Sequence, residues 1–140
     1  MNSTKQVTVA VLLTLLAGFG LATAQGPDRA QIKWLFENSP QYAAPAQYDT
    51  WWDELVLAVN APVQATLEGI VWHAAPARGF GCPVDEKVDA NTLCVGQWLS
   101  TGDIFIASMD RLDERVVKHE MLHAILNTGG HPAIFRKLNL

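Results

Sequence analysis

The stretch VVKHEMLHAILNTGGHPAIF, residues 116–135, contains three of the four histidines of this 140-residue chain. His119 and His123 are four residues apart, so a helix would place both side chains on one face. Apolar residues occupy most other positions of that turn, which indicates a helix buried on most sides. Because a buried helix must provide polar partners for two imidazoles and the Glu120 carboxylate, we expect these three side chains to share one site.

The expected helix spans about residues 110–127. Asp110, Asp113 and Glu114 lie near its start, where negative charge favours the positive end of the helix dipole. Gly129 and Gly130 follow its end, and glycine commonly supplies the left-handed residue that stops a helix.

The spacing of these side chains is typical of a zinc site. Two imidazoles one helical turn apart suit a tetrahedral zinc ion with bonds of about 2.0–2.1 Å. Glu120 is turned about 100° from His119 around the helix axis, so it lies beside the metal instead of binding it. That position suits the general base of a zinc-activated water. The alternative is an ordinary helix with a Glu–His surface pair, but the apolar surroundings favour metal binding.

A third protein ligand is expected after the helix. The chain beyond His123 contains no Asp, Glu, Cys or Tyr, and its only histidine is His131. The preceding Gly129 and Gly130 would let the chain reverse, and Pro132 would stiffen the exit. We expect His131 to complete the site from a tail with few core contacts. His73 and Asp103 are the next candidates, although a solvated strand histidine is the simpler interpretation of His73.

The rest of the chain predicts an α+β domain. Helical patterns cover DRAQIKWLFEN and YDTWWDELVLAVNAP, the second with Asp49 or Thr50 as its N-cap. Trp51 and Trp52 are interpreted as core residues, with a ligand-stacking platform as the alternative. Strands are expected in TLEGIVWHA, where Gly69 would mark a bulge, and in a hairpin made by QWL, STGD and IFIA. We expect N-terminal helices and a short, mostly antiparallel sheet with an edge strand near 104–107.

The amino-terminal segment has the pattern of a secretory signal. One lysine precedes an apolar run, and Ala22-Thr23-Ala24 has the small-x-small form of a cleavage site. We expect a signal peptide over 1–24 and a single domain over 25–140, with an uncleaved anchor helix as the alternative. Removal of Lys5 leaves 10 − 1 = 9 basic and 14 acidic residues, a net charge of −5. No basic stripe occurs, so nucleic acid and anionic membrane surfaces are poor candidate partners.

The two cysteines, Cys82 and Cys94, have eleven residues between them. In an exported protein a disulfide is the expected state. Zinc-binding cysteines usually occur in closely spaced pairs, so we interpret these two as structural.

The motif HExxH on a mostly apolar, late helix resembles the zincin metallopeptidases. More closely, HEMLHAIL…GHP resembles short exported bacterial proteins with matrixin-like zinc motifs, over about residues 116–135. The resemblance implies a small zincin-like domain with zinc as cofactor, His119 and His123 as ligands and Glu120 as base. It also implies that the edge strand near 104–107 holds a peptide substrate in an extended form. The chain departs from metzincins because position 129 is glycine and no methionine follows Met121.

The function expected from these patterns is that of an exported zinc-dependent hydrolase, and specifically a metallopeptidase acting on peptide or protein substrates. One alternative is a non-catalytic protein in which zinc stabilises the fold. Another is an exported binding module that uses a tryptophan-rich surface.

Overall fold

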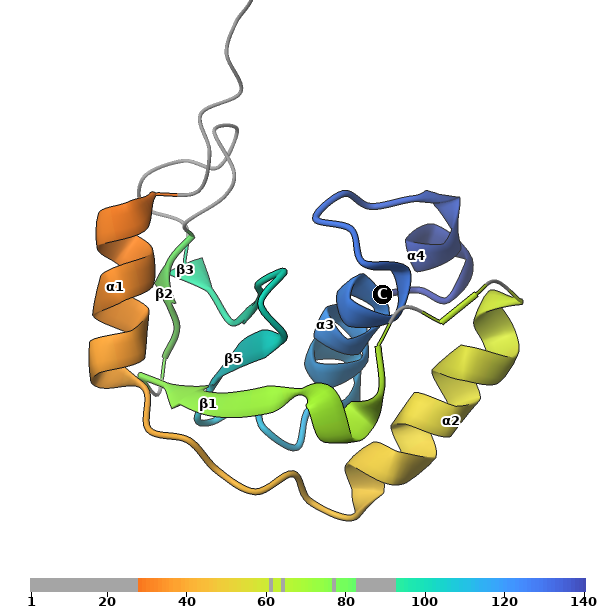
Figure 1. Cartoon of the computed structure of the whole chain (residues 1–140), viewed down its shortest axis with the longest axis horizontal. Coiled ribbons are helices and arrows are strands. Elements are labelled where there is room, and N and C mark those ends of the chain that lie inside the picture. Colours follow the sequence, from red (N-terminus) through yellow and green to blue (C-terminus); the bar gives the residue numbers. More distant parts are fainter. Residues whose placement is uncertain (1–27, 61, 64, 77, 83–92) are drawn as a thin grey trace, which may run out of the picture.

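The structure is a computed structural model that describes residues 28–60, 62–63, 65–76, 78–82 and 93–140. It is an α+β fold, as predicted (Figure 1). Its elements in chain order are α1 (Arg29–Asn38), α2 (Gln47–Val59), the short 3-10 helix η1 (Leu67–Gly69), β1 (Val71–Ala75), β2 (Phe80–Gly81), β3 (Leu93–Cys94), β4 (Gly96–Trp98), β5 (Asp103–Ala107), α3 (Glu114–Leu126) and α4 (Ala133–Lys137). The predicted signal peptide, residues 1–24, lies outside the described residues.

The main sheet has the strand order β1-β5-β4. Its longest pairing is parallel and joins β1 to β5, from Val71↔Asp103 to Ala75↔Ala107. β4 pairs antiparallel with β5 as the predicted hairpin, and β2 pairs antiparallel with β3 in a separate sheet. The main sheet is therefore mixed, in contrast to the expected mostly antiparallel one.

The prediction of an edge strand near 104–107 is wrong, because β5 is the central strand of the sheet. Its residues Ile104–Ala107 are all buried, and a continuous apolar run is typical of a strand covered on both faces. The edge strand beside α3 is β4, which is only three residues long.

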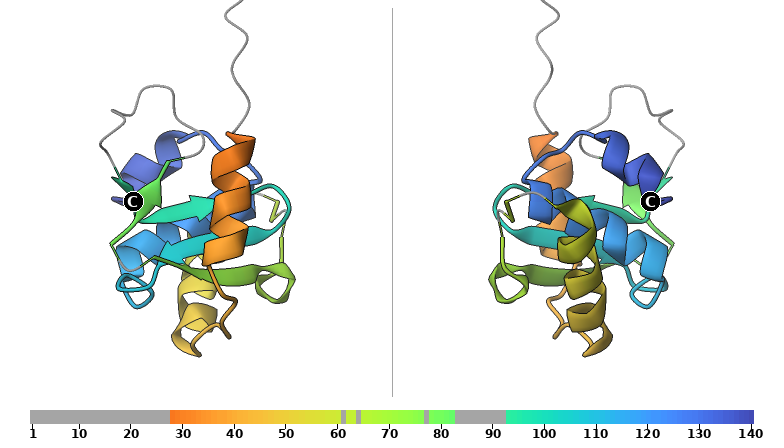
Figure 2. Two further views of the ribbon diagram at one scale, coloured as in Figure 1. Left: turned by 90° about the vertical axis from the view of Figure 1, so that its left-hand side faces the viewer. Right: turned by 90° about the vertical axis from the view of Figure 1, so that its right-hand side faces the viewer.

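The helices cover the main sheet on both faces (Figures 1 and 2). On one face Leu35 of α1 packs with Phe80 and Phe105. On the other face lies the larger core cluster, to which the sheet, α2 and α3 all contribute. Its buried members are Tyr48, Trp51, Trp52, Leu55, Ile70, Trp72, Trp98, Ile104, Ile106, Val117, Met121, Ala124 and Ile125. The assignment of Trp51 and Trp52 to the core is confirmed.

The first two helices form close to their predicted positions. The Asp28 side chain caps α1 by accepting hydrogen bonds from the Ala30 and Gln31 N–H groups. α2 begins at Gln47, before the predicted caps Asp49 and Thr50, and has no side-chain cap. It ends at Val59, and Asn60 follows in a left-handed conformation. Gly69 closes η1, where Thr66 accepts its N–H, so the predicted strand bulge is wrong.

The bounds of α3 differ from the prediction at its start. Turns and a bend occupy residues 108–112, and the helix begins at Glu114 after Asp113, whose carboxylate accepts the Arg115 and Val116 N–H groups. α3 ends at Leu126, and Asn127 supplies the left-handed stop with a φ of 48°. Neither Gly129 nor Gly130 has a positive φ, so their predicted role is wrong. Asparagine tolerates this conformation and stops the helix before the glycines are reached.

Cys82 and Cys94 form a disulfide, as predicted, with their Cα atoms 5.1 Å apart. A disulfide indicates an oxidising compartment. Within the part of the chain that the structure describes, no helix has the length and hydropathy needed to cross a membrane.

Replacing both cysteines by serine should lower the free energy of unfolding by about 3 kcal/mol, because the bridge restricts the unfolded chain. Urea denaturation of the wild type and the Cys82→Ser/Cys94→Ser variant measures this difference. Thiol labelling of unfolded, unreduced wild-type protein should detect no free cysteine. Two reactive thiols would contradict the assigned bridge.

Candidate metal centre

The three histidines of the motif converge at the end of α3. His119 Nε2 lies 3.2 Å from His123 Nε2 and 3.0 Å from His131 Nε2. Ligand atoms of all three residues lie within 4.8 Å of one another. Imidazole nitrogens bound at about 2.0–2.1 Å around a tetrahedral metal would be about 3.3–3.4 Å apart. The two separations from His119 Nε2 are close to this spacing, so the three histidines could hold a metal ion.

The turn that brings His131 back is shaped mainly by Asn127 and Thr128. After the left-handed Asn127, the Thr128 N–H donates to the His123 carbonyl at 3.1 Å. The Thr128 hydroxyl accepts the Gly130 N–H at 3.2 Å. The chain therefore reverses as predicted, but through local hydrogen bonds and not through left-handed glycines.

The orientation of His123 is fixed by its second ring nitrogen. Nδ1 lies 2.6 Å from the Thr128 carbonyl oxygen, which can only accept, so Nδ1 is the protonated nitrogen. The unprotonated Nε2 then lies toward His119 Nε2, and a hydrogen bond from the other ring nitrogen is typical of metal-binding histidines. The Trp98 ring lies nearly parallel to His123, at an interplanar angle of 8°.

Burial keeps the imidazoles of α3 in their neutral form. It lowers the pKa of His119 to about 4, and His123, His131 and Arg115 add repulsion of the charged form. Burial also lowers the pKa of His123, with His131 contributing in the same direction and the Thr128 hydrogen bond opposing it. Neutral imidazole is the form that binds metal, so these two residues are ready to bind at neutral pH.

Glu120 lies beside the histidine cluster but is not a member of it. Only 6% of the residue is exposed, and the Trp98 N–H on β4 hydrogen-bonds to its carboxyl group. Burial raises the pKa of Glu120 to about 8, although the Trp98 N–H opposes this. A cation held by the histidines would favour the ionised form. The location suits a group that exchanges protons next to a metal.

Gly96 on β4 makes room for that carboxyl group. A Cβ atom at position 96 would lie 2.5 Å from Glu120 Oε1 and 2.8 Å from Glu120 Cγ. Sequence reasoning missed this contact. The signal was a glycine inside a strand pattern, which often marks the close approach of another group.

The tail after His131 also contributes more than expected. Phe135 of α4 is 1% exposed, and Leu138 and Leu140 pack against the larger core cluster. The expectation of few core contacts is therefore wrong for this tail, although His131 itself is exposed.

His73 and Asp103, the alternative ligands, do not join the three histidines. His73 is buried, contrary to the expectation of a solvated residue. Its Nε2 lies 2.8 Å from Asp103 Oδ1, and its Nδ1 lies 3.2 Å from the Ser39 carbonyl oxygen. The ring stacks on Phe105 with centroids 4.4 Å apart. These contacts connect the end of α1 to β1 and β5, so His73 has a structural role.

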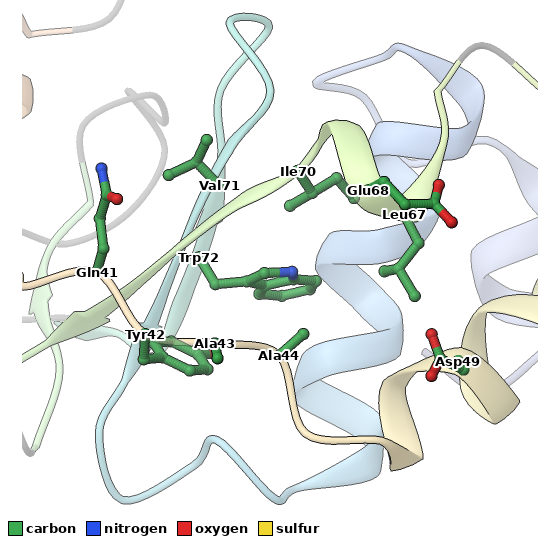
Figure 3. Close-up of a pocket in the computed structure, with 10 residues that line it drawn as sticks. All are labelled: Gln41, Tyr42, Ala43, Ala44, Asp49, Leu67, Glu68, Ile70, Val71 and Trp72. Atoms are coloured by element: carbon green, nitrogen blue, oxygen red, sulfur yellow. The ribbon is translucent and has the colours of Figure 1, made fainter.

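A cavity of about 400 Å³ lies elsewhere, between the α1–α2 connection, η1 and the start of β1 (Figure 3). Tyr42, Leu67 and Trp72 contribute apolar surface, and the Asp49 and Glu68 carboxylates lie at one side of it (Figure 3). None of the three clustered histidines lines this cavity. The candidate metal centre is therefore separate from it.

Comparison of the chain with protein-family models, with curated proteins and with solved structures finds no match. The interpretation of the centre therefore depends on its own geometry and chemistry.

Proposed function

We propose that this chain is an exported zinc-dependent hydrolase, and specifically a metallopeptidase. The observation that carries the proposal is the convergence of three histidine Nε2 atoms beside a buried glutamate that is outside their cluster. The motif resemblance to zincins supports the same reading. Export is supported by the Cys82–Cys94 disulfide together with the signal pattern of the first 24 residues.

Zinc is the metal that best fits the donor set. Histidine is a usual zinc ligand, and catalytic sites typically have three protein ligands with one position left open. Structural zinc sites usually have four protein ligands. In the described part of the chain no fourth His, Cys, Asp or Glu joins the cluster, which favours the catalytic alternative over a zinc-stabilised, non-catalytic protein.

When bound, the ion would act as a Lewis acid that polarises the substrate carbonyl and makes water acidic near neutral pH. Glu120 accepts a proton from the attacking water while the water oxygen forms a bond to the carbonyl carbon. As the C–N bond breaks, Glu120 passes that proton to the leaving amine. The Trp98 N–H holds the carboxyl group in place for both transfers, and Gly96, which has no side chain, leaves the space that this group occupies.

The strand that would hold an extended peptide is β4 and not residues 104–107, because β4 is the sheet edge beside α3. Both backbone groups of Trp98 already have partners there. The N–H bonds to Glu120, and the carbonyl accepts the Gln97 side-chain amide at 2.7 Å. A peptide pairing with β4 at this residue would have to replace these contacts.

Metal stoichiometry tests the proposal. Oxidised protein reconstituted with zinc at neutral pH and dialysed should retain one zinc ion per chain. His119→Ala and His123→Ala should each abolish retention, because each removes a ligand from α3. Glu68→Gln, which changes an exposed carboxylate beside the separate cavity, is the control and should retain zinc. Absence of bound zinc in the wild type would refute the proposed function.

A further inference from the structure

We propose that Phe135 is a positioning residue of the metal centre, whose ring closes one side of the three-histidine set and orients His131. The inference depends on the proposed metal binding. It concerns a residue outside the HExxH motif and outside the ligand set.

The four aromatic rings have an unusually regular arrangement. The ring centroids of His119, His123 and His131 are 4.9 to 5.0 Å from one another. The Phe135 centroid lies 5.0 Å from that of His119, 4.7 Å from that of His123 and 5.0 Å from that of His131. All six separations are nearly equal, so the four rings occupy the corners of a near-regular tetrahedron. Phe135 is therefore centred over the triangle of imidazoles.

This position determines which side of the triangle is open. A phenyl ring has no lone pair to donate to a metal ion, and it excludes water from the space that it fills. Phe135 is 1% exposed, so no solvent reaches the centre through it. Water or a substrate carbonyl must then approach the histidines from the side away from Phe135.

Phe135 is itself firmly held, whereas His131 is not. The Phe135 N–H donates to the Pro132 carbonyl at 3.0 Å, and its own carbonyl accepts the Leu140 N–H at 2.9 Å. His131 is exposed, and a Cβ atom added to nearby Gly129 would meet nothing within 4 Å. The His131 ring contacts the rings of Phe135, His119 and His123.

Preorganisation explains why this contact matters for binding. A ligand held in its bound position loses less conformational freedom when the complex forms. Residues that orient metal ligands typically change metal affinity by about 10- to 100-fold when they are replaced. Loss of the flat Phe135 ring should have an effect of this size.

The experiment compares Phe135→Leu and Phe135→Ile with wild-type protein. Each variant is tested as full-length, oxidised protein shown to be folded by circular dichroism. We expect zinc affinity, measured by competition with a chelator, to fall about 10- to 100-fold. We also expect the visible absorption of the cobalt-substituted protein to change from a four-coordinate to a higher-coordinate spectrum. Without the Phe135 ring, water can reach the metal from the side that this ring covers in the wild type.

Leu138→Ala is the matched control, since Leu138 packs against the larger core cluster and has no ring contact with the histidines. It should keep the wild-type zinc affinity and cobalt spectrum. A folded Phe135 variant with wild-type affinity and spectrum would overturn the inference, and if one variant does not fold, the other decides. Failure of the wild type to bind zinc would instead refute the proposed function.

Discussion

Glu120→Gln should abolish hydrolysis while the protein keeps one zinc ion per chain. Glutamine has nearly the same shape, and its carbonyl oxygen can still accept the Trp98 N–H, so the site should remain packed. The amide cannot accept the proton of the attacking water, and general base catalysis typically contributes about 10²- to 10⁴-fold to a rate. The measurements are zinc content and the rate of cleavage of unfolded protein substrates.

Glu114→Gln is the matched control, because Glu114 is an exposed glutamate in the first turn of the same helix. It should leave both zinc content and cleavage unchanged. Cleavage at the wild-type rate by Glu120→Gln would exclude Glu120 as the base. Loss of zinc from Glu120→Gln would instead mean that the carboxylate is a ligand.

His131→Ala should weaken zinc binding by more than about 100-fold, since replacement of residues that only orient ligands already costs 10- to 100-fold. The fold should remain intact, because His131 is exposed and the core contacts of the tail come from Phe135, Leu138 and Leu140. Chelator competition measures the affinity, and circular dichroism measures the fold.

Lys137→Ala, which changes an exposed residue of α4, is the control for general disturbance of the tail. It should bind zinc as the wild type does. If His131→Ala kept wild-type affinity while His119→Ala lost it, the third ligand would be a different group.

Local patterns predicted the parts of this fold that depend on local physics. Helical spacing located α1, α2 and most of α3, and turn residues located the β4–β5 hairpin. The parallel pairing of β1 with β5 was not predicted, because the two segments are separated by nearly thirty residues that include the disulfide loop. An apolar run such as Ile104–Ala107 is consistent with several positions in a sheet, so it did not identify the central strand.

In the candidate site, too, the residues close together in sequence were predicted and those remote in sequence were missed. The spacing of His119 and His123 and the elimination of other donors after them were enough to identify three residues that converge in the structure. Gly96 and Trp98 were missed because they approach Glu120 from a strand about twenty residues earlier. The buried environment of His73 was missed for the same reason, since Ser39 and Asp103 are remote in sequence.

All three clustered histidines lie between positions 119 and 131, so the candidate chelating unit is local in sequence. A loop of about ten residues closes within roughly 10–100 ns even in an unfolded chain. If the chain binds a metal ion, we expect the unfolded protein to bind it with the same residues. Binding to the unfolded state reduces the stability that a ligand gives to the native state. The turn that carries His131 is held by the hydrogen bonds of Thr128, and the β1–β5 pairing lies outside the chelating unit. Loss of a bound ion should therefore leave both in place. We therefore expect metal occupancy to be only weakly coupled to formation of the sheet, unlike in small domains that fold only around their metal.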